Sequence, residues 1–183
     1  MGKDKNWIVL VLLFWGWNCI AGSPVLNQEK AKRDKLVNTA ESQLFVREKT
    51  GHNDGKEVEE YLRVTGLGKG NAWCAAFLAW DHVKNNISSP HSAFCPDWFK
   101  SHVVYSQFSK TIEPFISQPG QVFGLYFESK GRIAHVGMIT GETRFSYNTI
   151  EGNTNDAGSR EGDGVYRKIR NKRQINKIAD YVK

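Results

Sequence analysis

The stretch Gly70-Asn71-Ala72-Trp73-Cys74-Ala75-Ala76-Phe77 opens the segment on which the fold depends. Residues 72–83 are apolar on nearly every side of a helix, which predicts a central, buried helix. Asn71 suits the N-cap position of that helix. Cys74 then falls in the first turn, where free backbone N–H groups and the helix dipole favour a thiolate over a thiol. The stretch therefore predicts a nucleophilic cysteine at the start of a buried helix, with a small core cysteine as the alternative.

The segments on either side of this helix differ in character. Before it, a charged stretch at 27–35 leads into an amphipathic helix pattern, and a second short helix pattern covers 58–64. Another helix is expected over 97–108. The second half carries strand patterns instead, at 121–127, 133–140, 144–150, 164–169 and 178–182. Helices followed by strands predict an α+β fold, in which N-terminal helices pack on an antiparallel β-sheet.

The first 22 residues have the layout of an export signal. Lys3 and Lys5 precede an apolar run at 7–17 that is too short for a comfortable membrane span. We expect a signal peptide at 1–22, a charged N-terminal segment at 23–35 and one catalytic domain at 36–183. A retained anchor and a lipoprotein lipidated at Cys19 stay open as alternatives. Either way, we expect the protein in the periplasm, the cell envelope or the extracellular space.

Charge and composition narrow the class of partner. The chain of 183 residues is 40% hydrophobic and 24% charged, which is typical of a folded protein, and its net charge of +6 favours an anionic partner. No nucleic-acid-binding motif is present, so we expect no nucleic-acid partner and, for one small domain, a monomer. The basic residues gather near the C-terminus, where a solvated face is the simplest interpretation and contact with anionic cell-envelope polymers is the alternative: Arg167, Lys168, Arg170, Lys172, Arg173 and Lys177.

A histidine and a carboxylate in the strand region are candidates to work with Cys74. His135 lies in the strand pattern at 133–139, and Gly137 leaves room on the same face. A hairpin centred on position 143 places Glu151 opposite His135, at a Cβ separation of roughly 4.5–5.5 Å. A carboxylate there can hold the ring in the tautomer that a general base needs.

Three residues near these candidates carry further expectations. Gly141 and Glu142 are expected to form the turn of the hairpin. Asn153 offers an amide oxygen that could orient the ring in place of Glu151. Simpler interpretations are a satisfied core histidine and an exposed carboxylate at the end of a strand.

Taken together, three motifs resemble the CHAP family of cysteine- and histidine-dependent amidohydrolases and peptidases. They are the stretch at 70–77, His135-Val136-Gly137 and Glu151-Gly152-Asn153, within a likeness that covers roughly 36–170. Further matching residues lie upstream and downstream: Glu48, Gly51, Asn53, Asp54, Tyr61, Leu62, Ser159, Arg160, Glu161, Gly162, Gly164 and Val165.

The resemblance implies a papain-like fold of the NlpC type and an exported enzyme that acts on peptidoglycan peptides. Cys74 would attack an amide carbonyl, His135 would protonate the leaving amine, and Glu151 would orient His135. The bond would lie in a stem or cross-bridge peptide, or join N-acetylmuramic acid to L-alanine. Asn71 and Asn53 are candidates for the oxyanion hole, which lacks an evident second donor. We expect neither a cofactor nor a metal requirement.

Several alternatives remain open at this point. A disulfide between Cys74 and Cys95 would leave a cell-wall-binding module without hydrolytic activity. The same catalytic residues could instead serve an acyltransferase, which passes the thioester to an amine or alcohol, or an exported toxin. A structural zinc site is a weaker alternative, because its four candidate ligands match no familiar spacing: His82, His91, Cys95 and His102.

Overall fold

The computed structural model describes residues 24–109, 115–156 and 162–182. The expected signal peptide, Cys19, and the matching residues Ser159, Arg160 and Glu161 lie outside this part of the chain. Within it, no helix combines the length and the apolar character that crossing a membrane requires.

Three α-helices precede all the strands that the structure describes. They are α1 (Pro24–Glu41), α2 (Lys56–Val64) and α3 (Cys74–Lys84). The strands are β1 (Val103–Ser106), β2 (Val122–Phe127), β3 (Arg132–Glu142), β4 (Ser146–Thr154), β5 (Gly164–Asn171) and β6 (Ile175–Ala179). Three short 3-10 helices complete the described elements: η1 (Cys95–Phe99), η2 (Glu128–Lys130) and η3 (Lys172–Gln174).

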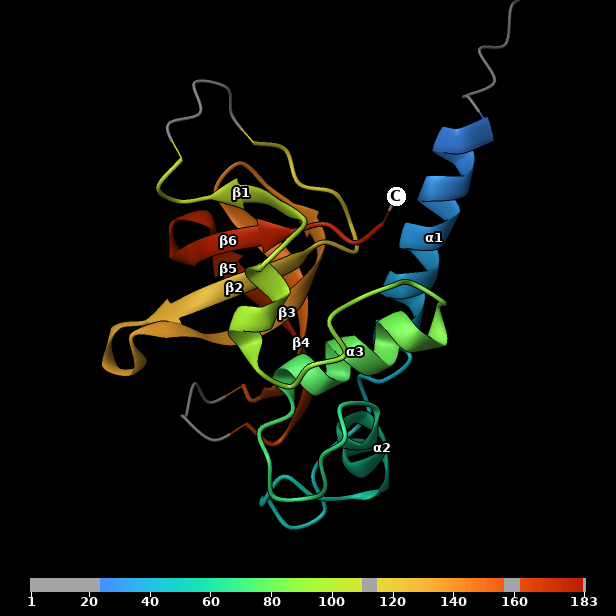
Figure 1. The fold of residues 1–183 in the computed structure, drawn as a ribbon, viewed down its shortest axis with the longest axis vertical. Helices are drawn as coiled ribbons and strands as arrows, with labels where there is room; N and C mark the ends of the chain where they lie inside the picture. The colour runs from blue at the N-terminus through green and yellow to red at the C-terminus, as the bar shows by residue number, and fades with distance from the viewer. Residues whose placement is uncertain (1–23, 110–114, 157–161, 183) are drawn as a thin grey trace, which may run out of the picture.

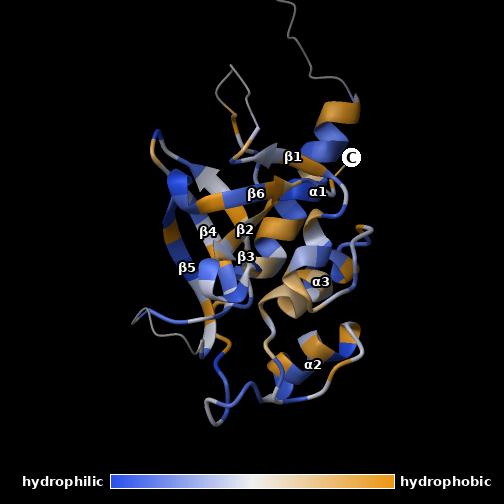
Figure 2. Ribbon diagram, turned by 60° about the vertical axis from the view of Figure 1, so that its left-hand side comes forward, coloured by the Kyte–Doolittle hydropathy of each residue, from blue (hydrophilic) through white to orange (hydrophobic). Residues whose placement is uncertain are grey.

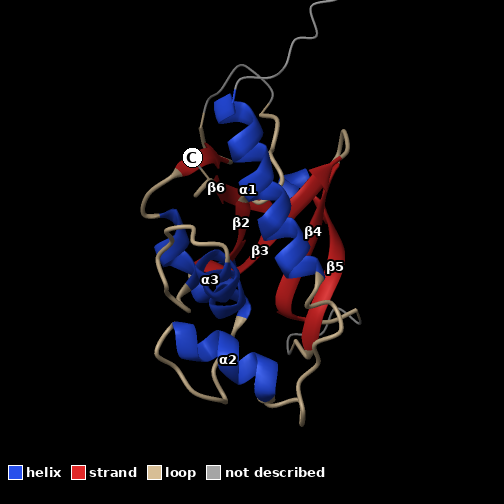
Figure 3. Cartoon of the chain, turned by 90° about the vertical axis from the view of Figure 1, so that its right-hand side faces the viewer, coloured by secondary structure: helices blue, strands red, loops and turns tan. Residues whose placement is uncertain are grey.

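The strands form one antiparallel sheet in the order β1-β6-β2-β3-β4-β5. The helices gather on one side of this sheet, to the right of the strands in Figure 1 and in front of them in Figure 3. One apolar cluster joins the helices to the near face of the sheet, and a second, centred on Phe123, Ile139 and Ile178, covers the far face. The expected α+β fold, with helices packed on an antiparallel sheet, is confirmed.

Helix α3 is the centre of the larger cluster. Every residue from Cys74 to His82 is buried, and the first turns of the helix are coloured as apolar in Figure 2. Tyr61 of α2 packs its ring against Trp80 of α3, with ring centroids 4.9 Å apart. The predicted central, buried helix is therefore confirmed, although it begins at Cys74 and not at residue 72.

The register of the β3–β4 hairpin differs from the prediction. Gly141 and Glu142 belong to β3, and the turn is formed by residues 143–145, closed by a 2.8 Å hydrogen bond from the Thr143 N–H to the Ser146 carbonyl. Met138 pairs with Ile150, so Glu151 aligns with Gly137 and is diagonal to His135. The hairpin centre expected at position 143 was wrong by one position. Thr143 side-chain bonds to the Ser146 backbone stabilise the longer turn.

Two other local predictions were wrong. Asn71 does not cap α3: Trp73 occupies the N-cap position, and the Asn71 amide nitrogen bonds the Gly68 carbonyl oxygen at 2.9 Å. The helix expected over 97–108 is only the five-residue η1, followed by β1. His102, with φ of 59°, ends the helical path, and the β-branched residues after it pair with β6 instead.

Candidate active site

Cys74 lies where β3 and β4 separate. The last backbone pair between these strands is Met138 with Ile150, although β3 starts at Arg132 and β4 continues to Thr154. The start of α3 packs into this gap: a Cβ on Gly152 of β4 would lie 2.7 Å from the Trp73 ring and 2.9 Å from the Phe77 Cβ. Only glycine at position 152 allows this close approach. Cys74, as the first residue of α3, thus lies at the gap between β3 and β4.

His135 and Glu151 meet beside Cys74. The His135 Nε2 and the Glu151 Oε2 are 2.8 Å apart, and the His135 side chain is 13% exposed while the Glu151 side chain is fully buried. Because Nε2 is engaged by the carboxylate, Nδ1 is the ring nitrogen left for the Cys74 sulfur. The structure therefore brings the three predicted residues together, through a diagonal contact across the hairpin.

Arg170 and Thr149 fix the carboxylate of Glu151. The Arg170 Nε donates to Glu151 Oε1 at 2.8 Å, its Nη2 donates to Oε2, and the Thr149 hydroxyl donates to Oε1 at 2.7 Å. Burial alone would raise the pKa of Glu151, but the hydrogen bonds from Arg170 and His135 lower it to about 2. Glu151 is therefore held as a carboxylate at all ordinary pH values.

Arg170 is the supporting residue that the sequence interpretation missed. It belongs to the basic C-terminal cluster, which was interpreted as a solvated face, yet its side chain is only 22% exposed. The sequence showed only that Arg170 follows Lys168 by two residues in a strand. The two side chains were therefore expected on the same face of the sheet. Nothing in the sequence showed that Glu151 lies on the same face.

The electrostatics favour a thiolate at Cys74 and an imidazolium at His135. The hydrogen bond from Cys95 is the largest influence that holds the pKa of Cys74 well below its usual value, and His135 and the Val136 N–H act in the same direction, against burial. Burial lowers the pKa of His135, but the bonds to Cys74 and Glu151 outweigh it and raise the pKa to about 9. Between these two pKa values the pair is expected to exist as an ion pair.

Cys95 is a second thiol beside the candidate nucleophile. Its sulfur is 3.6 Å from the Cys74 sulfur, both residues are buried, and both are free thiols, so the alternative of a structural disulfide is not realised in this structure. The hydrogen bond with Cys74, together with burial, raises the pKa of Cys95. Cys95 is thus the donor of the pair, and Cys74 accepts its S–H.

Replacing Cys95 with alanine is expected to raise the pKa of Cys74, because the thiolate loses its largest source of stabilisation. The measurement is the rate of alkylation by iodoacetamide as a function of pH, which follows the thiolate fraction. The midpoint should lie well below pH 9 in the wild type and at higher pH in Cys95→Ala. Cys95→Ser, which keeps a donor, should restore part of the shift. Equal midpoints in wild type and Cys95→Ala would contradict this assignment.

The three asparagine candidates have other positions. The Asn153 side chain bonds other residues than His135: its amide oxygen accepts the Trp73 N–H at 3.1 Å, and its amide nitrogen donates to the Asn53 side-chain oxygen at 3.0 Å. These bonds hold the residue before Cys74 against β4. Asn71 is exposed and bonded to Gly68, as described above. Glu48 joins the same support, since its carboxylate accepts the Trp73 indole N–H at 2.7 Å.

The residues considered for zinc do not converge. His82 is buried, its Nδ1 is 2.8 Å from the Leu78 carbonyl oxygen, and its ring packs edge-on against Trp98. His102 instead contacts Ser101 through Nδ1. Within the described ranges no three histidine, cysteine or acidic side chains form a group that could hold a metal ion.

Comparisons with known proteins identify the fold. No protein-family model matches the sequence, and no curated protein matches it. Among solved structures, an NlpC/P60 family protein from Bacillus cereus superposes with a TM-score of 0.51 at 16% sequence identity. The match covers 82% of this chain but only 40% of that chain, so this protein corresponds to less than half of the matched one. The α+β architecture described here is accordingly the papain-like fold of the NlpC/P60 type.

Proposed function

We propose that this protein is a cysteine hydrolase that cleaves an amide bond in peptidoglycan, with Cys74 as nucleophile, His135 as general acid and base, and Glu151 as the residue that orients His135. The observation that carries the proposal is the sequence of contacts from the Cys74 sulfur at a helix start, through the His135 ring, to the buried Glu151 carboxylate. A nucleophile, a base that contacts it and an acid that orients the base are the groups that catalyse covalent acyl transfer.

The arrangement supports a two-step reaction. The Cys74 thiolate adds to the carbonyl carbon, and His135 gives its proton to the leaving amine as the C–N bond breaks, which leaves a thioester. Water, deprotonated by His135, then attacks the thioester, releases the acid and restores the Cys74 thiolate beside a protonated His135. The Cys74 N–H, in the first turn of α3, has no intrahelical partner and suits the developing oxyanion.

The sequence, the fold and the net charge support peptidoglycan as the substrate and export as the location. The motifs around Cys74, His135 and Glu151 resemble CHAP domains, the fold is shared with an NlpC/P60 family protein, and the net charge of +6 suits an anionic envelope. Residues 1–22 have the layout of a signal peptide, and the basic residues near the C-terminus other than Arg170 would face anionic envelope polymers. We include membership of the CHAP family, export and a monomeric state in the proposal.

The test is to incubate the purified protein with peptidoglycan and to identify new termini by mass spectrometry. New amino termini within the peptides would indicate an endopeptidase, and released whole stems would indicate an N-acetylmuramoyl-L-alanine amidase. Cys74→Ala should release neither, because the nucleophile is absent. Equal products from wild type and Cys74→Ala would rule out the proposed mechanism.

A further inference from the structure

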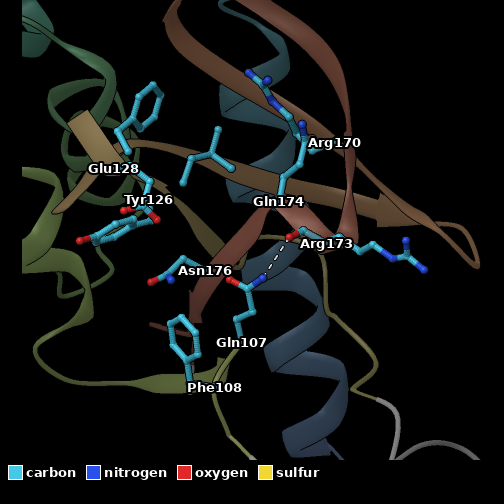
Figure 4. Close-up of a pocket in the computed structure, with 10 residues that line it drawn as sticks. Gln107, Phe108, Tyr126, Glu128, Arg170, Arg173, Gln174 and Asn176 are labelled. Carbon is cyan, nitrogen blue, oxygen red and sulfur yellow. Dashed lines mark hydrogen bonds between the residues drawn. The ribbon is translucent and has the colours of Figure 1, made fainter. Parts of the chain in front are cut away.

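A pocket of about 730 Å³ opens on the face of the sheet opposite α3. Residues from β2, β5 and β6, from η2 and η3, and from the segment after β1 line it (Figure 4). Three aromatic side chains expose unusually large areas here: Phe108 is 80% exposed, Tyr126 43% and Phe127 40%. Exposed aromatic rings around a hollow are typical of a binding surface and not of a core.

Asn176 presents a polar group to this pocket. The residue is only 6% exposed, and its side chain is directed between the rings of Tyr126 and Phe108 in Figure 4. No side-chain hydrogen bond joins its carboxamide to any of the residues that the structure describes. The carboxamide can therefore bond a molecule that enters the pocket, and each such hydrogen bond would contribute about 0.5–1.5 kcal/mol. A ligand that supplies both a donor and an acceptor would match the carboxamide.

The pocket adjoins the candidate active site at two points. Leu125, which lines the pocket, pairs across the sheet with His135, so the two side chains share a face. Arg170 also lines the pocket and holds the Glu151 carboxylate through two hydrogen bonds. Cys74, His135 and Glu151 do not line the pocket themselves, but Leu125 and Arg170 place it next to the His135 and Glu151 pair.

We propose that this pocket binds the peptide on the leaving-group side of the cleaved bond, with the Asn176 carboxamide bonded to a backbone amide of that peptide. The inference rests on the proposed function, in which His135 protonates the leaving amine, so the leaving segment must emerge on the His135 side. A carboxamide matches a peptide group, since each offers one N–H donor and one carbonyl acceptor. The exposed rings of Phe108 and Tyr126 would cover apolar side chains of the same segment.

The first experiment measures cleavage of soluble cross-linked muropeptides by the full chain. Asn176→Ala should raise KM about tenfold with kcat nearly unchanged, because losing hydrogen bonds made equally in ground and transition states weakens binding alone. Phe108→Ala, at a highly exposed position, provides a second variant in which folding is not at risk. Asn148→Ala removes an exposed carboxamide from β4, away from the pocket, and should leave KM unchanged.

The second experiment separates this inference from the proposed function. Cys74→Ala is titrated with a sugar-free stem peptide and with an N-acetylglucosamine oligomer, and each titration is repeated in Cys74→Ala/Asn176→Ala. Binding of the peptide that weakens in the double variant supports the inference, even if the wild type shows no hydrolysis. Binding of the sugar alone would overturn it. Hydrolysis with wild-type KM in both Asn176→Ala and Phe108→Ala would also overturn it, while leaving the proposed function intact.

Discussion

Replacing Glu151 with glutamine is expected to lower kcat/KM by about 100-fold or more, since an orienting carboxylate and a correctly held base each contribute on that scale. The amide would present a weaker acceptor, or a donor, to the His135 Nε2 that now lies 2.8 Å from a carboxylate oxygen. His135 would then lose the negative charge that helps to raise its pKa to about 9. The thiolate and imidazolium pair would be less populated near neutral pH.

The same substitution is expected to destabilise the fold by about 3 kcal/mol, because it leaves Arg170 partly buried without its counter-charge. The pKa of Glu151 is about 2, below the ordinary 4.5, so the carboxylate contributes stability that is complete above pH 4.5 and is lost as the pH falls toward 2. Urea unfolding of wild type and Glu151→Gln at pH 7 and pH 3 measures this. The difference between the two proteins should be larger at pH 7.

Glu142→Gln is the matched control for this prediction. Glu142 is a carboxylate in β3 that pairs with Lys172 at 2.8 Å, but it contacts neither His135 nor Arg170 through a hydrogen bond. A partly exposed ion pair contributes at most about 1 kcal/mol, so its loss should leave kcat/KM unchanged. If Glu142→Gln and Glu151→Gln lowered kcat/KM equally, Glu151 would have no orienting role.

The parts that the sequence predicted well are those set by local patterns. The apolar run after Cys74 shows the buried helix, and the alternating strands after residue 120 show the sheet, because each pattern depends only on near neighbours. The contacts that were missed join distant segments. Arg170 of β5 contacts Glu151 of β4, and Cys95 of η1 contacts Cys74. Neither contact produces a repeating pattern in the sequence.

Hairpin register is the intermediate case. A hairpin centre at position 143 predicted that His135 and Glu151 are direct cross-strand partners. The observed turn at residues 143–145 instead aligns Glu151 with Gly137. The contact survives because a long carboxylate side chain can reach a diagonal neighbour. The shift also explains Gly137: the Glu151 side chain occupies the space above it, so a Cβ there would lie 2.7 Å from Glu151 Cγ.

Gly137→Ala is therefore expected to damage both stability and activity. The added Cβ would also lie 2.7 Å from the Phe123 ring, which is fully buried and cannot retreat, so we expect a loss of about 1–3 kcal/mol. Glu151 would be displaced from His135, and kcat/KM should fall with it. Gly141→Ala on the same strand is the matched control, because its Cβ would meet nothing closer than the Asn148 side chain at 3.8 Å.

The two alanine variants separate steric displacement from the general effect of replacing a strand glycine. Neither glycine has a positive φ, so backbone strain does not distinguish them. Urea unfolding should show a clear loss for Gly137→Ala and little change for Gly141→Ala. The pH profile of Cys74 alkylation gives a second measure that needs no substrate: displacing Glu151 from His135 should move its midpoint to higher pH in Gly137→Ala alone. Identical stability and identical alkylation profiles in the two variants would show that Gly137 does not position Glu151.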